Sequence, residues 1–259
     1  MEWRKHLAKP PRALKLREKI CMEDRSWVFD VHLLHNILWV GTSEGLYSYD
    51  DKQSELPLLR KDRFYVNSIC SCGDNLYILG RSKDESTSIS LVKYCVTRYP
   101  LVEELWQKPL LISFFARMTC VGNKIVVTAF RGGDIKVYDE DGVEKKRIIF
   151  LTSGFQPHYP VCPSLGNNDV VLVGVWNRVI RCNLGSSQGL RDEIFECETM
   201  CNINEMCADR KTGRIYVAPY GLYKIYILSP IGKTQLSGLH EWWTSWLPFS
   251  NGMRKMNEF

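Results

Sequence analysis

Few side chains in this sequence have the types and spacings that catalysis requires. The histidines are dispersed along the chain at His6, His32, His35, His158 and His240. A catalytic site needs a nucleophile, a base or a metal ion that converge on one pocket. The sequence contains no GxSxG, HExxH, GxGxxG or P-loop motif, which argues against serine hydrolase, zinc protease and nucleotide-binding chemistry. We therefore expect a non-catalytic protein that needs no cofactor and binds no nucleotide.

The ten cysteines also point away from a metal site or a disulfide scaffold, because their share of the chain is low. Five of them lie in short apolar runs, where cysteine acts as a small buried hydrophobe: Cys70, Cys72, Cys120, Cys162 and Cys207. The densest group, Cys197, Cys201 and Cys207, has no CxxC pair and no nearby histidine, so zinc is not expected. Free thiols indicate a reducing compartment, and we expect a cytoplasmic protein.

The elements that position the remaining polar side chains form an internal repeat. Five short apolar runs open on a turn residue and end on Gly or Ala: 36–41, 74–80, 123–129, 169–174 and 213–218. Their equivalent positions are Ile37, Leu76, Ile125, Val170 and Ile215. The spacing of about 40–50 residues is the length of one four-stranded propeller blade.

Further strands flank each of these runs, as expected for one blade per repeat. One strand precedes each run, and two follow it, of which the last is more polar. The runs are apolar at consecutive positions, as in Leu38, Trp39 and Val40, which indicates a strand covered on both faces. No helical-period segment separates the strands, so a parallel sheet is not indicated. We predict an all-β, single β-propeller of four-stranded antiparallel blades, in a five- or six-bladed ring.

The domain boundaries follow from composition and from the repeat. We predict a basic leader at 1–11, a propeller over 12–241 and a Trp-rich C-terminal tail at 242–259, with blade cores near 27–61, 65–108, 114–151, 159–198 and 203–239. The segment 12–20 is expected to be a strand that helps to close the ring. The first twenty residues carry seven Lys or Arg and two Glu, which accounts for the whole net charge of +5. The body is therefore balanced, which disfavours a large nucleic-acid surface, and no apolar run is long enough to span a membrane.

The stretch NILWVGTSEGLYSYDD at 36–51 resembles the repeat of bacterial ligand-sensing regulator propellers. It is also similar to the start of citron-homology propellers, and the other four units are closer to the NHL repeats of tripartite-motif proteins. The resemblance covers about fifteen residues of the first unit and is degenerate elsewhere. It implies a non-catalytic recognition propeller, a repeat protein that acts as a scaffold in protein–protein interaction, and it does not decide among these families.

The loops that lead into the first strand of each blade are the predicted binding site. They gather at one end of the ring and carry aromatic residues and arginines, the types that interface hot spots favour. We predict a protein or peptide partner bound by Arg25, Trp27, Arg63, Tyr65, Phe115, Arg117, His158, Tyr159 and Asn204. Arg117 and Tyr159 are the preferred pair, because they stand at equivalent places in adjacent units.

Two alternatives use the same face. Aromatic residues beside arginines also stack unpaired bases, so single-stranded RNA binding is one of them. The other is a calcium-dependent propeller lactonase or esterase, which would need oxygen ligands at the axial ends of the innermost strands. Asp30, Asn67, Asn204 and Glu205 lie near such ends, but the third and fourth units offer Arg117 and Tyr159. A guanidinium repels calcium, so this alternative ranks below the binding module.

Overall fold

The structure is a computed structural model that describes residues 27–49, 58–60, 64–82, 89–98, 101–112, 116–129, 134–149, 157–161, 169–185, 191–197, 203–208, 212–219, 225–229 and 234–235. The predicted leader, the segment 12–20 and the Trp-rich tail lie outside these residues. Within the described stretches, no helix is long and apolar enough to cross a membrane.

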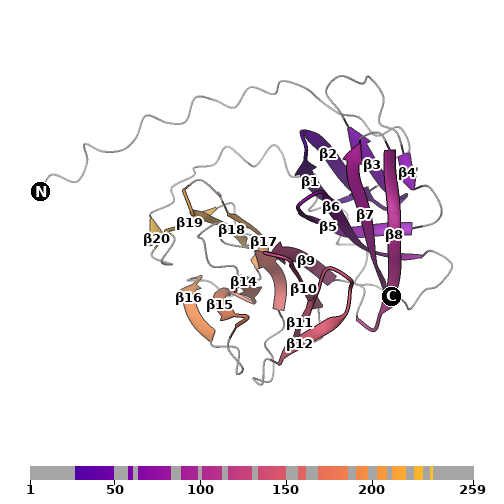
Figure 1. Cartoon of the computed structure of the whole chain (residues 1–259). Coiled ribbons are helices and arrows are strands. Elements are labelled where there is room, and N and C mark those ends of the chain that lie inside the picture. The colour runs from indigo at the N-terminus through magenta and orange to yellow at the C-terminus, as the bar shows by residue number, and fades with distance from the viewer. Residues whose placement is uncertain are drawn as a thin grey trace, which may run out of the picture.

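Five four-stranded sheets follow one another along the chain (Figure 1). Blade one comprises β1 (Val28–Leu34), β2 (Ile37–Thr42), β3 (Leu46–Tyr49) and β4 (Leu58–Arg60). Blade two comprises β5 (Phe64–Cys72), β6 (Asn75–Ser82), β7 (Ile89–Arg98) and β8 (Leu101–Leu110). Blade three comprises β9 (Ala116–Val121), β10 (Lys124–Ala129), β11 (Asp134–Tyr138) and β12 (Glu144–Ile149). Blade four comprises β13 (Pro157–Val161), β14 (Val170–Val175), β15 (Arg178–Asn183) and β16 (Arg191–Glu196), and blade five comprises β17 (Ile203–Ala208), β18 (Ile215–Pro219), β19 (Tyr226–Leu228) and β20 (Thr234–Gln235).

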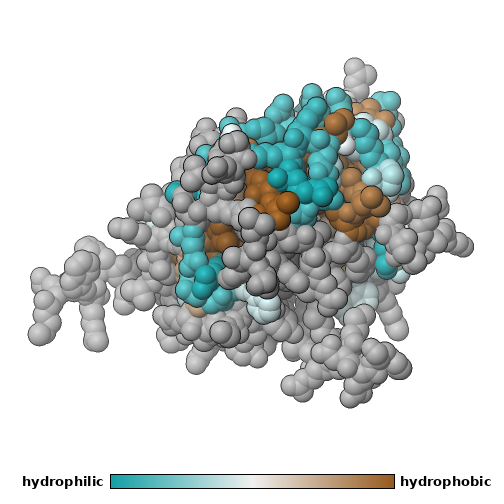
Figure 2. All heavy atoms as spheres, turned by 90° about the horizontal axis from the view of Figure 1, so that it is seen from below, coloured by the Kyte–Doolittle hydropathy of each residue, from teal (hydrophilic) through white to brown (hydrophobic). Residues whose placement is uncertain are grey.

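The predicted all-β propeller architecture is confirmed. Every sheet is antiparallel, and its strands pair in chain order from the first to the fourth. The first strands of successive blades contact one another, β1 with β5, β5 with β9, β9 with β13 and β13 with β17. The first strand of each blade therefore lies nearest the centre (Figure 1), and the fourth lies at the rim. From below the view of Figure 1, the described surface is mostly hydrophilic with smaller hydrophobic patches (Figure 2).

Tight turns with left-handed backbone join the first and second strands. His35 and Asn36 both have positive φ, at 54° and 63°, as a two-residue hairpin turn of type I′ requires. Gly73, Gly122 and Gly213 supply the positive φ in blades two, three and five. In blades one, two and three, these local turn residues explain why the apolar run in the sequence opens on Asn or Asp.

The glycine that ends the apolar run of blade one is explained by its neighbour. A Cβ atom built on Gly41 would lie 2.7 Å from Cγ1 of Val66 and 3.0 Å from the Val66 carbonyl oxygen. Val66 belongs to β5, so any side chain at position 41 would push blade two away from blade one. Gly174 likewise faces Ile203 and Met206 of the following blade, so the terminal glycine permits close approach of the next blade in blades one and four.

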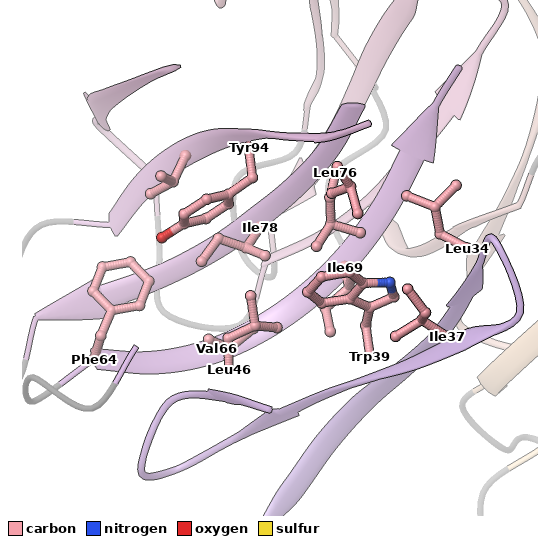
Figure 3. Close-up of a cluster of buried hydrophobic side chains, with 12 residues drawn as sticks. Leu34, Ile37, Trp39, Leu46, Phe64, Val66, Ile69, Leu76, Ile78 and Tyr94 are labelled. Atoms are coloured by element: carbon pink, nitrogen blue, oxygen red, sulfur yellow. The ribbon is translucent and has the colours of Figure 1, made fainter. Parts of the chain in front are cut away.

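Side chains of neighbouring blades interlock in four hydrophobic cores, one between each pair of successive blades. Between blades one and two, Trp39 and Leu46 pack against Phe64, Val66 and residues of β6 and β7 (Figure 3). The second strands are buried on both faces, as predicted from their consecutive apolar residues. Among the described residues, no such core joins blade five to blade one.

Candidate functional site

The candidate site is the end of the ring at which the first strand of each blade begins, at Val28, Phe64, Ala116, Pro157 and Ile203. We call this end the entry face. Of the predicted site residues, Trp27, Tyr65 and Arg117 are described with their side chains and lie here. His158, Tyr159 and Asn204 are second or third residues of β13 and β17 and are placed as strand positions only. Arg25, Arg63 and Phe115 lie outside the described residues.

The strand register puts four residues at one equivalent position near the axis. Each of them pairs with the last or next-to-last residue of its second strand: Asp30 with Gly41, Arg117 with Thr128, Tyr159 with Gly174, and Glu205 with Ala218. In blades one, four and five, the residue just before this position is skipped in the pairing, which is the pattern of a β-bulge. Bulges bend a strand and redirect its side chains, and the contacts of Asp30 and Glu205 with the charge of Arg117 show that these two groups lie near one another.

Asp30 ties blade one to blade two. One oxygen of its carboxylate accepts hydrogen bonds from the Ile69 backbone N–H at 2.8 Å and from the Ser68 hydroxyl at 3.1 Å. The other oxygen accepts one from the Val31 N–H at 2.8 Å. Burial raises the pKa of Asp30 above its ordinary value, and the hydrogen bonds and the nearby charge of Arg117 partly offset this rise. The carboxylate is therefore held in place by three donors although its charged form is poorly solvated.

Arg117 links three blades through one guanidinium nitrogen. Its Nη1 donates to the carbonyl oxygen of Phe29 in β1 at 3.1 Å and to that of Asn67 in β5. Because Arg117 itself belongs to β9, this side chain reaches across the centre of the ring. The sequence argument placed Arg117 at the partner-binding surface, and the structure adds a structural role that makes its replacement an ambiguous test of binding.

Glu205 is the third charged residue of a cluster that also contains Asp30 and Arg117. Desolvation by burial is the largest effect and raises the pKa of Glu205, the positive charge of Arg117 lowers it, and the negative charge of Asp30 raises it. Glu205 is nevertheless exposed to solvent. Surrounding protein thus desolvates the carboxylate although part of the residue remains accessible to water. We find no group of three metal-ligating side chains within the described residues.

Aromatic and apolar side chains surround this charged centre. Tyr65 at the start of β5 is half-buried, and the guanidinium of Arg81 lies 5.0 Å from the centre of its ring, a cation–π distance. The backbone of Trp27 is held beside the turn between β2 and β3. Its backbone N–H donates to Ser43 Oγ at 3.0 Å, and its carbonyl oxygen accepts from the Ser43 backbone N–H at 2.9 Å. Its side chain is 57% exposed.

Two exposed residues of the entry face were missed by the sequence argument. Trp176 lies in the turn between β14 and β15 with φ of 53°, and its carbonyl accepts from the Ile203 N–H at 2.6 Å. Positive φ is rare for a bulky residue, and such strain gathers at functional sites. Leu111, just after β8, is 96% exposed, and its carbonyl accepts from Lys136 Nζ at 3.1 Å. For Trp176, a tryptophan within a turn between two strands could have indicated an exposed aromatic residue. For Leu111, no feature of the sequence indicates exposure.

The cysteines correct one expectation. Cys70 is buried, and its sulfur lies 3.0 Å from that of Cys120 across the interface of blades two and three. Cys72 is half-buried, whereas Cys207 was expected to be buried and is exposed. The reason is that Met206 points into the core with blade four, which turns Cys207 to the opposite side of β17. Cys162 and Cys201 lie outside the described residues.

His32 and His35 lie away from the entry face. His32 Nε2 is 2.7 Å from Ser71 Oγ, and His35 Nε2 is 3.0 Å from a carboxylate oxygen of Asp74 in an exposed pair. Asp74 and His35 occupy the turns between first and second strands, at the other end of the ring. Neither histidine therefore meets the axial carboxylates.

No protein-family model matches the sequence, and no curated protein matches it. Solved structures do resemble the fold. A chain in the crystal structure of the mitotic checkpoint complex has a TM-score of 0.61 at 11% identity, covering 83% of this chain and 66% of that one, just under two thirds. A protein of unknown function from Bacteroides caccae has a TM-score of 0.59 at 12% identity, covering 83% and 82%. A chain of the nidogen/laminin complex has a TM-score of 0.58 at 10% identity, covering 81% and 79%. Identities this low show the propeller fold alone.

Proposed function

We propose that this chain is a non-catalytic propeller that binds a protein or peptide partner at its entry face. The observation that carries the proposal is the gathering of exposed large hydrophobic side chains at this end of the ring. Trp27, Leu111 and Trp176 lie in or beside its loops, and Ile149 ends β12 at the same level. At the opposite end of the ring, the described exposed large hydrophobic residues are Val143, in the turn after β11, and Leu33, near the end of β1.

The chemistry of this face suits a protein partner. Exposed aromatic and aliphatic side chains supply contact area, and the axial charges supply direction and specificity. Several of these side chains are on rigid supports, since the backbone of Trp27 and that of Trp176 are hydrogen-bonded to neighbouring elements. A preorganised surface loses less conformational entropy on binding. Two of the similar folds come from crystal structures of protein complexes, which is in keeping with this proposal.

The axial cluster supports binding over calcium-dependent hydrolysis. A calcium site needs six to eight oxygen ligands, and the guanidinium of Arg117 lies among the two carboxylates that would have to supply them. The positive charge of Arg117 opposes a divalent cation at this place. An added calcium ion should accordingly leave the melting temperature unchanged.

The proposal is tested by affinity capture with mass spectrometry, followed by binding measurements on the purified partner. Trp27→Ala with Leu111→Ala should weaken binding by about tenfold or more, as the loss of hot-spot residues does. The matched control is Leu105→Ala with Val143→Ala, which removes exposed apolar side chains from the rim strand β8 and from the opposite end. Both double variants should melt close to the parent protein.

Two results would move the function elsewhere. Equal binding by the two double variants would show that the entry face is not the site. Capture of RNA whose affinity falls steeply with salt would favour the nucleic-acid alternative.

A further inference from the structure

Blade one has an uncovered side. In the described part of the chain, four hydrophobic cores join successive blades, and none joins blade five to blade one. On β1, Leu34 points into the core with blade two, while Val31 and Leu33 point to the other side. Val31 is 55% exposed and Leu33 is 64% exposed. These two side chains form an apolar wall on the innermost strand of the blade.

Equivalent positions in other blades show what this wall lacks. Val31, Met118 of β9 and Met206 of β17 each pair with the corresponding valine of the second strand. Met118 and Met206 are each only 5% exposed, because each packs against the preceding blade. Val31 therefore occupies a position that is built for contact with a preceding neighbour.

The facing side of blade five is more polar. Met206 packs toward blade four, so Glu205 and Cys207 project from β17 to the opposite side, where both are exposed. The space between blades five and one thus has one apolar wall, formed by Val31 and Leu33, and one wall that carries the carboxylate of Glu205. An occupant that fits both walls needs an apolar side and a basic side.

The segment 12–20, RALKLREKI, has this composition. In an extended chain, Leu14, Leu16 and Ile20 lie on one side, which also carries Arg12 and Glu18 toward its ends. The other side holds Ala13 and the basic residues Lys15, Arg17 and Lys19. Residues 21–26 separate the segment from Trp27, and six residues span up to about 20 Å. This connection is long enough for the segment to fold back along β1.

We propose that residues 12–20 dock as an extended strand between blade five and blade one. Leu14 and Leu16 cover Val31 and Leu33, and the basic side faces Glu205. The segment thereby supplies the contact that blade one lacks, and the ring is closed by the chain itself. The Trp-rich tail 242–259, a second copy of the chain and a separate protein are the competing occupants.

Photo-cross-linking of the full chain distinguishes these occupants. A benzophenone amino acid placed at position 31 should form an intramolecular cross-link into residues 12–20, mapped by mass spectrometry after cleavage at acidic residues. The same probe at position 149, exposed at the rim of blade three, serves as the control and should not label this segment. Cross-links from position 31 into residues 242–259 or into a second molecule would overturn the proposal. A yield of cross-links into residues 12–20 that is no higher from position 31 than from position 149 would also overturn it.

Variants of the segment test its apolar side. Leu14→Ser with Leu16→Ser should lower the cross-link yield from position 31 at least fivefold. The control, Lys5→Ser with Lys9→Ser, changes charged residues of the same terminus outside the segment and should leave the yield unchanged. An equal yield from both double variants would contradict docking through the leucines. Since the cross-link is mapped first in the parent sequence, the proposal stays testable even if the leucine variant unfolds.

Discussion

Replacing Arg117 with methionine should destabilise the ring in a pH-dependent way. Methionine keeps most of the aliphatic packing and removes the donors that reach Phe29 and Asn67 in the two preceding blades. Hydrogen bonds from a charged donor contribute about 1.5–3 kcal/mol each. Both bonds come from one nitrogen and the nearby Glu205 is exposed to solvent, so we take about 1–1.5 kcal/mol for each, which gives a loss of about 2–3 kcal/mol at pH 7.5.

The pH dependence arises from the two carboxylates that Arg117 stabilises. Without its charge, the pKa values of Asp30 and Glu205 rise further, because Arg117 lowers both in the folded protein. A raised folded pKa means that the folded state binds more protons than the unfolded one, so stability falls as pH rises through that pKa. The loss caused by Arg117→Met should therefore be smaller near pH 4, where both carboxyl groups are largely protonated, than at pH 7.5.

Urea unfolding followed by tryptophan fluorescence, at pH 7.5 and at pH 4, measures both effects. A loss of 2–3 kcal/mol corresponds to a shift of about 1 M in the urea midpoint. The control is Arg147→Met, because the Arg147 side chain is 48% exposed and its ion pairs with Asp134 and Glu144 lie within blade three, away from the axis. Exposed pairs contribute at most about 1 kcal/mol. An Arg117 variant that is no less stable than the control, or whose loss is equal at both pH values, would refute the reasoning.

Three further predictions concern single residues. Gly41→Ala should lower the free energy of unfolding by about 1–3 kcal/mol, since the added Cβ would meet Val66. Gly73 has open space around it but positive φ, so Gly73→Ala should lose only the free energy of backbone strain; chemical denaturation compares the two variants. Asp30→Ala should be less stable than Asp30→Asn, because alanine leaves the Ile69 N–H and the Ser68 hydroxyl without an acceptor. Because asparagine does not titrate and the pKa of Asp30 is raised, the asparagine variant should lose less stability than the parent as pH rises from 4 to 7. At pH 8 a maleimide should modify Cys207 well before Cys70, which is buried; peptide mapping of a time course that finds the reverse order would contradict the placement of β17.

The repeat was predictable because its signals are local. A turn residue, consecutive apolar residues and a terminal glycine occupy adjacent positions, and each has a short-range cause. His35 and Asn36 adopt the left-handed turn, and Trp39 and Val40 are covered on the two faces of one strand. Only the reason for the glycine is tertiary, since the Gly41 backbone is approached by Val66 of the next blade. The order of strands and the blade period could therefore be inferred without coordinates.

The site could be predicted only in outline. Loops before the first strands must gather at one end of the ring, which is why Trp27, Tyr65 and Arg117 lie on one face. Their roles depend on what lies across the centre. Arg117 finds two carbonyl groups of other blades there, and no sequence pattern shows that Asn67 and Phe29 present them.

Exposure was likewise decided by the tertiary structure. Alternation along β1 and β17 indicates that Val31 and Met206 each point to one side of a blade, yet it does not indicate whether another blade covers that side. Met206 is covered by blade four and Val31 is not covered by blade five. An apolar residue at the same strand position is therefore buried in one blade and exposed in another. The reason is that burial requires a second surface to meet the strand, and the sequence of a strand specifies only the surface of that strand.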